Sequence, residues 1–377
     1  HNISSIATKL YNTANYERRK VWEETGKIPN YNLQDKALKE NQWYQLLSSQ
    51  TAQAVLECLD KNYKSWFALR KTDSKSRPPR FRKKDMLSVV SYKQLFRIIG
   101  NELRISTSRK YQAEHKIKYI QIPFIEWKQM NGTAKFCQIK FNKGKWFAHI
   151  VYEVPETQPV LNDAVMSVDM GIINTAATAD TTGDSKVYSG KQILAIQHYF
   201  NKEKAKMQSV LAKQYPKRKW SRVLGILQNK QNRQINQALH THSKGIIEDC
   251  KNKGIKTLVV GDVTDIRKDK HWRKKTSQKL HSWSFSKFAQ QLEYKAIQAG
   301  IRFVRASEAY TSKTCAGCGI IKTSNRKHRG LYACKCGYTQ NADVNGATNI
   351  LKKYLRDFMS RSIGSVALPS VVRTSIV

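Results

Sequence analysis

The sequence contains no long hydrophobic run and comparatively few acidic residues. Among its 377 residues, no apolar segment approaches the roughly 20 residues of a membrane-spanning helix, which excludes an integral membrane protein. Glycine and proline, at 18 and 8 residues, are not in excess, and 40% of the residues are hydrophobic. Such a composition can form a core and excludes wholesale disorder. The length predicts two to three domains.

The scarcity of acids leaves a large positive charge. Asp and Glu number 28 against 67 Lys and Arg, so the formal net charge is +39. A phosphate backbone is the commonest partner of a folded basic protein, and we therefore predict nucleic-acid binding that weakens as salt increases. A solvated basic surface and an anionic membrane surface are the alternatives.

The number and positions of the cysteines do not predict a disulfide framework. The seven cysteines are odd in number, and four of them lie within one short segment, which favours a metal site in a reducing cytoplasm. Two short knuckles supply the thiolates, with glycines at 317, 319 and 337 where the backbone must fold around the metal. Four sulfur ligands fit tetrahedral, structural Zn²⁺ and leave no open position for catalysis. The predicted ligands are Cys315, Cys318, Cys334 and Cys336.

The hydrophobic period changes along the chain. Residues 1–72 repeat apolar side chains at helical spacing and predict a helical domain. Between 88 and 154 the side chains alternate and turns intervene, which predicts antiparallel strands, enough for a small barrel, in a domain at 73–160. From about 164, short buried strands and long helices follow one another and predict an α/β domain.

Basic segments near prolines and in loops are candidates for contact with a nucleic-acid backbone. Residues 70–84 hold eight basic residues and one acid, and Pro78-Pro79 prevents a continuous helix there. A solvated linker is the alternative. A second basic stretch runs from Arg267 to Lys287, and a third lies between the two knuckles. The predicted nucleic-acid-binding residues are Arg80, Phe81, Arg82, Lys83, Lys84, Arg273, Lys274, Lys275 and Lys327.

Two acids stand out in this basic chain. Asp169 ends a buried strand beside a glycine turn, and Asp343 follows the cysteine cluster and opens a helix. Carboxylates that hold two Mg²⁺ ions about 4 Å apart can stabilise both the attacking and the leaving oxygen of a phosphodiester. Taken alone, Asp169 is equally typical of a turn residue and Asp343 of a helix N-cap.

These motifs together resemble a known family. Ser167-Val-Asp-Met-Gly-Ile-Ile-Asn174, the four-cysteine segment and Ala342-Asp-Val-Asn-Gly-Ala-Thr-Asn-Ile350 occur in that order. With Pro79-Arg-Phe-Arg-Lys-Lys84 and Ser312-Lys-Thr-Cys-Ala-Gly-Cys-Gly319, they resemble TnpB, the transposon-encoded, RNA-guided DNA nucleases related to type V CRISPR effectors. The resemblance covers nearly the whole chain, apart from a first strand and the tail after about 360. Because the chain starts at His1 rather than Met, we expect further residues before it.

The resemblance implies a multidomain α+β protein. A helical recognition domain (1–72) and a β-barrel wedge domain (73–160) would precede an RNase H-like RuvC nuclease domain (161–310). A zinc ribbon that binds target nucleic acid (311–340) would interrupt that domain, whose last helix (341–360) and a C-terminal tail (361–377) would follow.

The resemblance also implies partners and cofactors. A guide RNA copied from the transposon end would pair with double-stranded target DNA next to a short target-adjacent motif. Delegating sequence choice to base pairing explains the large unspecific positive charge. Catalysis would use Mg²⁺, with two ions held by Asp169 and Asp343, and one Zn²⁺ would be structural. We expect a cytoplasmic prokaryotic protein, associated with the nucleoid when bound to DNA and with no membrane partner.

The chain departs from the family at its third acid. The usual glutamate at the end of the central strand falls on Gly261, which binds no metal through a side chain. Asp262 could substitute if the strand end twists, since adjacent strand residues face opposite sides. Glu293 on the next helix could reach the site instead. A third possibility is that the site lacks a third acid and the protein binds without cutting.

Three functions therefore compete. The first is an RNA-guided, Mg²⁺-dependent DNA endonuclease, with Asp169, Asp343 and either Glu293 or Asp262 as its acids. The second is a nuclease-inactive, RNA-guided DNA-binding repressor. The third is a transposase that joins DNA ends itself, which the ribbon-within-nuclease order disfavours. Retention of Asp169 and Asp343 favours the first over the second.

Overall fold

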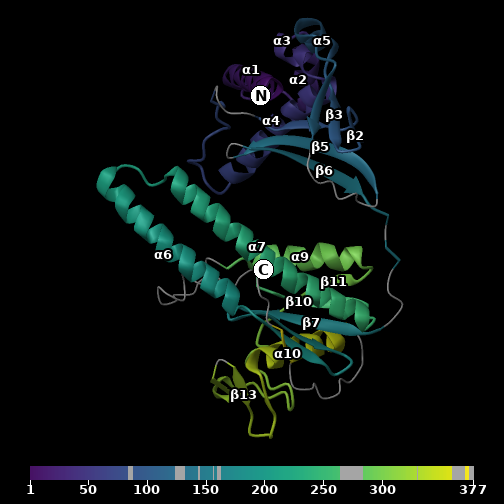
Figure 1. Ribbon diagram of the computed structural model, residues 1–377, viewed down its shortest axis with the longest axis vertical. Helices are drawn as coiled ribbons and strands as arrows, with labels where there is room; N and C mark the ends of the chain where they lie inside the picture. Colours follow the sequence, from purple (N-terminus) through teal and green to yellow (C-terminus); the bar gives the residue numbers. More distant parts are fainter. Residues whose placement is uncertain are drawn as a thin grey trace. The chain divides into compact units, whose positions relative to one another are not determined.

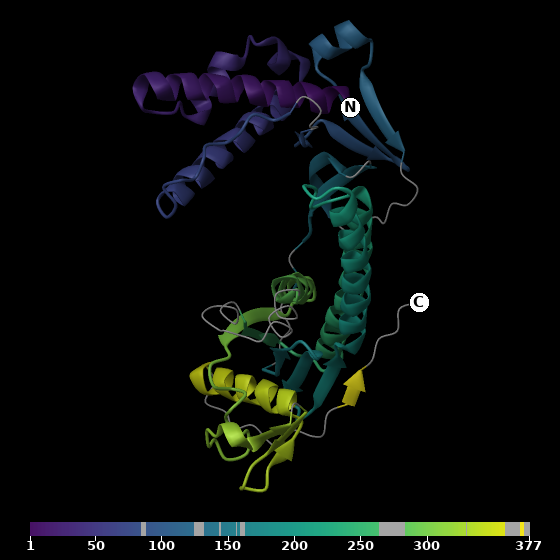
Figure 2. The same ribbon diagram turned by 90° about the vertical axis from the view of Figure 1, so that its left-hand side faces the viewer.

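The structure is a computed structural model that describes residues 1–83, 88–123, 132–142, 145–155, 157–158, 163–263, 283–328, 330–358 and 370–372. The chain divides into two compact units, His1–Pro155 and Glu156–Val377, drawn in Figures 1 and 2. Among the described residues, no helix has both the length and the apolar character that crossing a membrane requires.

The first unit begins with helices, as the spacing of its apolar residues predicts. They are α1 (Asn2–Thr25), α2 (Tyr31–Leu38), α3 (Gln42–Leu46), α4 (Ser49–Arg70) and, between strands, α5 (Arg109–His115). Asn30 caps α2 by accepting a hydrogen bond from the Leu33 N–H, and Gly26 ends α1 in the left-handed conformation. Arg18 is fully buried between these helices, where its guanidinium donates to Asp60 at 3.1 Å.

Six strands of the first unit form two separate three-stranded sheets. They are β1 (Val90–Tyr92), β2 (Phe96–Ile99), β3 (Glu102–Ser106), β4 (Tyr119–Pro123), β5 (Thr133–Asn142) and β6 (Lys145–Glu153), in the orders β1-β5-β6 and β2-β3-β4. The predicted antiparallel pairing is confirmed. A closed barrel is not, because no ladder among the described strands joins the two sheets. Helices and sheets also share one apolar core, which includes Leu10, Leu59, Leu103 and Cys137.

The second unit is built on one mixed six-stranded sheet. Its strands are β7 (Val165–Met170), β8 (Asn174–Asp180), β9 (Ser185–Ser189), β10 (Thr257–Asp262), β11 (Arg302–Ser307) and β15 (Ser370–Val372), in the order β11-β10-β7-β8-β9-β15. Strands β7, β10 and β11 are parallel, whereas β8 runs antiparallel to both of its neighbours. The carboxyl ends of β7, β10 and β11 therefore meet at one edge of the sheet, which we call the carboxyl edge.

Helices cover both faces of this sheet. They are α6 (Lys191–Gln214), α7 (Arg222–Asn252), α9 (Phe285–Gln298) and α10 (Ala342–Phe358). On one face, Met166, Val168, Leu258 and Val260 pack with α7 and α9. On the other, Val165 and Val259 pack with Ile350 and Leu351 of α10. We call these two sides of the sheet the α9 face and the α10 face. Because strand residues alternate between faces, each side chain at the carboxyl edge lies on one or the other.

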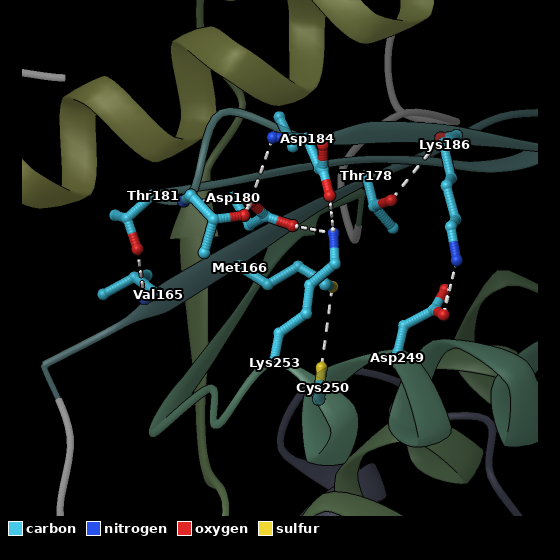
Figure 3. A network of polar contacts seen from close by, with 12 residues as sticks. Val165, Met166, Thr178, Asp180, Thr181, Asp184, Lys186, Asp249, Cys250 and Lys253 are labelled. Carbon is cyan, nitrogen blue, oxygen red and sulfur yellow. Dashed lines mark hydrogen bonds and ion pairs between the residues drawn. The ribbon is translucent and has the colours of Figure 1, made fainter. Parts of the chain in front are cut away.

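A polar network fixes the end of α7 at the opposite edge of the sheet (Figure 3). The Lys253 ammonium lies 2.7 Å from Asp180, the last residue of β8, and 2.9 Å from Asp184, in the turn before β9. Lys186 of β9 pairs with Asp249 at 2.5 Å. The N–H of Thr181, in the same turn, donates to the Val165 carbonyl at the start of β7. The C-terminus of α7 is thereby placed at the edge where β7 begins.

A small module follows β11 before α10. It contains a 3-10 turn (Thr323–Asn325) and the strands β12 (Arg326–His328), β13 (Leu331–Ala333) and β14 (Thr339–Gln340), paired in that order. Its apolar centre is small, with Tyr332 fully buried beside Cys315 and Ala342. Such a small core is typical of a module that a metal stabilises.

Candidate active site and metal centre

Asp169 lies at the carboxyl edge, on the α10 face. It is two residues beyond Ser167, whose hydroxyl donates to the Ala347 carbonyl of α10 at 2.7 Å. Gly346 of the same helix approaches so closely that a Cβ there would lie 2.3 Å from Asp169 Oδ2. Any larger residue at 346 would collide with this carboxylate. The turn-residue interpretation of Asp169 therefore does not account for its surroundings, which are those of a packed carboxylate.

Asp343 lies in the first turn of α10 but does not cap the helix. Asn341 does so, because its side-chain oxygen accepts the N–H groups of Asp343 at 2.9 Å and Val344 at 3.4 Å. The Asp343 carboxylate instead accepts from Asn174 Nδ2 at 2.7 Å and pairs with Arg326 at 3.0 Å. The N-cap alternative is thus wrong, and the carboxylate is available on the α10 face.

A third carboxylate on this face belongs to Glu308, which the sequence reasoning missed. Glu308 directly follows β11, and its side chain bends over Gly261 of β10. A Cβ at position 261 would lie only 1.9 Å from Glu308 Oε1. That oxygen is buried and has no hydrogen-bond partner among the described residues. An orphaned, buried carboxylate oxygen is a candidate ligand for a divalent cation.

The electrostatics link these carboxylates into one cluster. Burial raises the pKa of Asp169 well above its usual value, and the charges of Glu308 and then Asp343 raise it further, whereas Arg326 acts to lower it. Burial, followed by the charge of Asp262, raises the pKa of Glu308 to about 7. We define Asp169, Glu308 and Asp343 as the carboxylate cluster. A divalent cation would relieve the mutual repulsion that these shifts express.

The two residues predicted as the third acid lie on the other face. Glu293 belongs to α9, which packs on the face opposite to α10, and its carboxylate pairs with Arg305 at 3.0 Å. The prediction that Glu293 approaches Asp169 is wrong because the sheet separates them. Asp262 is exposed and, one residue beyond Gly261, alternates toward the α9 face. It contributes charge near Glu308 but does not replace it in the cluster.

A sequence signal for Glu308 does exist in the strand periodicity. Val304 and Ala306 pack on the α10 side, and Ala306 is paired with Gly261 across the ladder. Glu308 continues the same alternation two residues later. Its selection depends on knowing that β11 is the parallel neighbour of β10, which is a matter of sheet order and not of sequence spacing.

The four cysteines of the two knuckles converge as predicted. All four sulfur atoms lie within 4.8 Å of one another, and two pairs, Cys315 with Cys336 and Cys318 with Cys334, are separated by 3.7 Å. Four sulfurs at the Zn–S distance of about 2.3 Å would stand about 3.8 Å apart in a tetrahedron. The donor set and its spacing therefore fit zinc. Gly319 and Gly337 each follow a knuckle with φ of 79° and 88°, the left-handed turn expected there.

Two buried asparagines connect the cysteine module to the carboxylate cluster. Asn345 of α10 donates to the Thr314 carbonyl at 2.9 Å and accepts the Ala316 N–H at 3.0 Å. Asn349, one turn later, donates to Thr311 and Thr314. Both residues lie on the helix that carries Asp343 and Gly346. The position of this helix therefore depends on the segment that leads into the first knuckle.

The basic candidates differ in their surroundings. Arg80, Phe81 and Lys83 are exposed, and Lys327 is exposed on β12. Arg82 is half-buried and packs over the Tyr11 ring at 3.8 Å, with its backbone bonded to Asn12. It thus has a structural role alongside any contact with nucleic acid. Lys84, Arg273, Lys274 and Lys275 lie outside the described residues.

Substituting Gly346 is expected to test the packing around Asp169. The methyl group of Gly346→Ala would displace the carboxylate by roughly an ångström, which should lower the rate of any phosphodiester cleavage at this site about a hundredfold. Gly245→Ala is the matched control, since that helical glycine faces Tyr188 at an ordinary 3.4 Å. Cleavage rates of both variants provide the measurement. Equal rates for the two variants would contradict the packing argument.

Two family models match separate parts of the chain, and known proteins match most of its length. The family model described as "Probable transposase" matches residues 149–267, and the one described as "Cas12f1-like, TNB domain" matches residues 285–350. The chain is 28% identical to the "Putative RNA-guided DNA endonuclease InsQ" of Escherichia coli K12, over 89% of this chain and 82% of that protein. It is 23% identical to the "TnpB-like protein ORF457" of Acidianus two-tailed virus, over 93% and 82%.

A solved structure shares the fold. The chain matches the "Cryo-EM structure of the Cas12f1-sgRNA-target DNA complex" with a TM-score of 0.65 and 16% identity, over 92% of this chain and 81% of that one. At this identity the match concerns the mixed α/β architecture alone.

Proposed function

We propose that this chain, which belongs to the TnpB family, is an RNA-guided DNA endonuclease that hydrolyses phosphodiester bonds at the carboxylate cluster. The observation that carries the proposal is the buried Glu308 oxygen without a hydrogen-bond partner among the described residues. It lies on the α10 face of the sheet, as do Asp169 and Asp343. The net charge of +39 suits a protein with two nucleic-acid partners. The relatives named as RNA-guided endonucleases support the same reaction class.

The sheet supports an RNase H-like nuclease domain. Its order β9-β8-β7-β10-β11, with β8 antiparallel among parallel strands, places the three acids at the carboxyl ends of β7 and β11 and at the start of α10. In open α/β sheets, ligands generally bind outside the carboxyl ends of the strands. We assign residues 161–310 and 341–360 to this domain, 311–340 to an inserted zinc ribbon, 1–72 to RNA and DNA recognition, 73–160 to the wedge domain, and 361–377 to a C-terminal tail.

The metal would be Mg²⁺, held by Asp169, Glu308 and Asp343. When bound, it supplies charge stabilisation to the attacking and leaving oxygens of an in-line displacement. Hard carboxylate oxygens are the donors that this ion prefers. Gly261 leaves room for the Glu308 side chain, and Gly346 leaves room for that of Asp169.

Other side chains of the site orient the carboxylates. Asn174 donates to Asp343 Oδ2 and Arg326 to Oδ1, so both oxygens have defined directions. Arg326 also brings positive charge close to Asp169. A guanidinium in this position can donate two hydrogen bonds to phosphate oxygens while the carboxylates hold the metal.

A nuclease-inactive repressor would follow if Gly261 left the site with two acids. Glu308 supplies the missing carboxylate from the neighbouring strand, so the endonuclease is the better-supported function. The guide RNA would derive from the transposon end, and the target would be double-stranded DNA next to a short flanking motif. We expect the protein in the prokaryotic cytoplasm.

The test combines the protein with the RNA that co-purifies with it, a duplex that pairs with the guide portion, and Mg²⁺. The wild-type protein is expected to cut the duplex, and Asp169→Ala to bind it without cutting. Gel shift and product analysis on the same samples separate binding from cleavage. Binding without cleavage by the wild-type protein would favour the repressor.

A further inference from the structure

A long stretch of the second unit lacks acids altogether. Between Glu203 and Glu248 the chain has ten Lys or Arg residues and no Asp or Glu, although acids make up 28 of its 377 residues. This stretch comprises the second half of α6, the turn between the two helices and most of α7. Figure 1 shows the two helices as a paired hairpin that continues beyond the sheet strands.

Among the described residues, the outer part of this hairpin buries few side chains, of which Leu224 is one. The buried residues of α6, namely Ile193, Gln197 and Phe200, all lie in its first ten positions, and the described residues 201–214 contain no buried side chain. At 1.5 Å per residue, these positions extend about 21 Å. We call residues 201–230 the hairpin arm.

The arm projects from the same edge of the sheet as the carboxylate cluster. Gly190, immediately before α6, donates its N–H to the Ile173 carbonyl in the turn that follows β7. The far end of α7, by contrast, is held at the opposite edge through Lys253 and Asp180. The paired helices therefore leave the sheet at its carboxyl edge.

The end of the arm combines aromatic rings with cations. Trp220 is 66% exposed, and the edge of its indole lies against Gly225, where a Cβ would lie 2.8 Å from the ring. Tyr215 is 50% exposed, with the Arg218 guanidinium 4.8 Å from its ring centroid. Exposed basic residues lie close to both rings in the sequence: Lys213, Lys217, Arg218, Lys219, Arg222 and Lys230.

This combination is that of a stacking platform. Ser221 caps α7 by accepting from the Leu224 N–H at 3.3 Å, and Gly225 leaves room for the edge of the Trp220 ring, so the exposed indole is pre-positioned. A duplex hides its base faces, whereas unpaired bases stack on exposed rings while cations hold the phosphates. Because the whole stretch lacks acids, a polyanion is favoured as its binding partner over a protein surface of mixed charge.

We infer that the hairpin arm binds an unpaired DNA strand beside the cleavage site, with Trp220 and Tyr215 as base platforms. The choice of DNA rests on the proposed function, because guide pairing displaces one DNA strand and the arm leaves the edge that carries the carboxylate cluster. The choice of unpaired nucleotides rests on the arm itself.

The test measures binding of oligodeoxythymidine and of oligouridine of equal length, without guide RNA or Mg²⁺, in an Asp169→Ala background. Trp220→Ala is expected to weaken oligodeoxythymidine binding about fivefold or more, and Trp220→Phe to retain most of it. The triple change Lys217→Ala, Arg218→Ala, Lys219→Ala should reduce the salt slope by about two. Tyr199→Ala is the matched control, since this exposed tyrosine precedes the acid-free stretch on the same helix.

The outcomes separate this inference from the proposed function. If Trp220→Ala binds oligodeoxythymidine as its parent does, the arm is not the platform, whether or not the wild-type protein cleaves. A loss of binding confined to oligouridine would overturn the assignment to DNA. A loss of self-association with unchanged oligonucleotide binding would identify a second copy of the chain as the partner. If the variant loses oligodeoxythymidine binding but the wild-type protein never cleaves, the inference about the hairpin arm is supported and the proposed endonuclease function is wrong.

Discussion

Replacing Glu308 with glutamine is expected to abolish guided DNA cleavage while leaving guided DNA binding intact. The amide keeps the shape of the side chain over Gly261 but removes one of three negative charges from the cluster. Two carboxylates seldom hold two Mg²⁺ ions firmly enough for in-line attack, so the rate should fall about a hundredfold or more. Cleavage under single-turnover conditions provides the measurement.

Two further substitutions make this prediction specific. Glu293→Gln is the matched control, because its carboxylate lies on the α9 face and pairs with Arg305, and it should cut at the wild-type rate. A loss of cleavage in Glu293→Gln with retention in Glu308→Gln would reverse the assignment.

Placing a glutamate at position 261 of β10 in place of Glu308 tests whether the position of the third carboxylate matters. Gly261→Glu alone should be inactive, because its side chain would occupy the space of Glu308 Oε1. The double change Gly261→Glu, Glu308→Ala restores three carboxylates with the strand-end glutamate that the sequence resemblance implies, and it should recover cleavage. An inactive but folded double variant would argue that Glu308 does more than supply a carboxylate.

Replacing Cys315 with serine is expected to empty and unfold the cysteine module. Structural zinc contributes about 10–16 kcal/mol of apparent binding free energy in small modules, and this module has few buried apolar residues of its own. Zinc content should fall from one ion per chain to nearly none. Hydrogen exchange should rise across residues 311–340 and persist at wild-type levels in β7, β8 and β10.

The loss should also reach the carboxylate cluster. Asn345 and Asn349 lose their partners at Thr314 and Thr311, so the start of α10 and the Asp343 carboxylate would no longer be held in place. Cys315→Ser is therefore expected to stop cleavage as well. Cys58→Ser, a half-buried cysteine of the first unit, should keep both zinc and activity. A purified wild-type protein without zinc would contradict the assignment of the metal.

Much of this protein was determined by local sequence. The cysteine spacing identified the four thiols that converge, because side chains of a knuckle lie close along the chain and need only a glycine turn to meet. Asp169 and Asp343 were identified for a similar reason, since each stands at the end or beginning of an element with a strong local signal. The helical and strand periods likewise predicted the main elements of both units.

Only the tertiary structure decided the third acid, the shared core of the first unit and the separation of its two sheets. Glu308 joins Asp169 through the order of strands in the sheet, and Glu293 is excluded because α9 packs on the other face. Neither fact is encoded in the spacing along the chain. Strand pairing and helix packing join residues that are far apart in sequence, so the face on which a side chain lies depends on contacts that no local pattern contains.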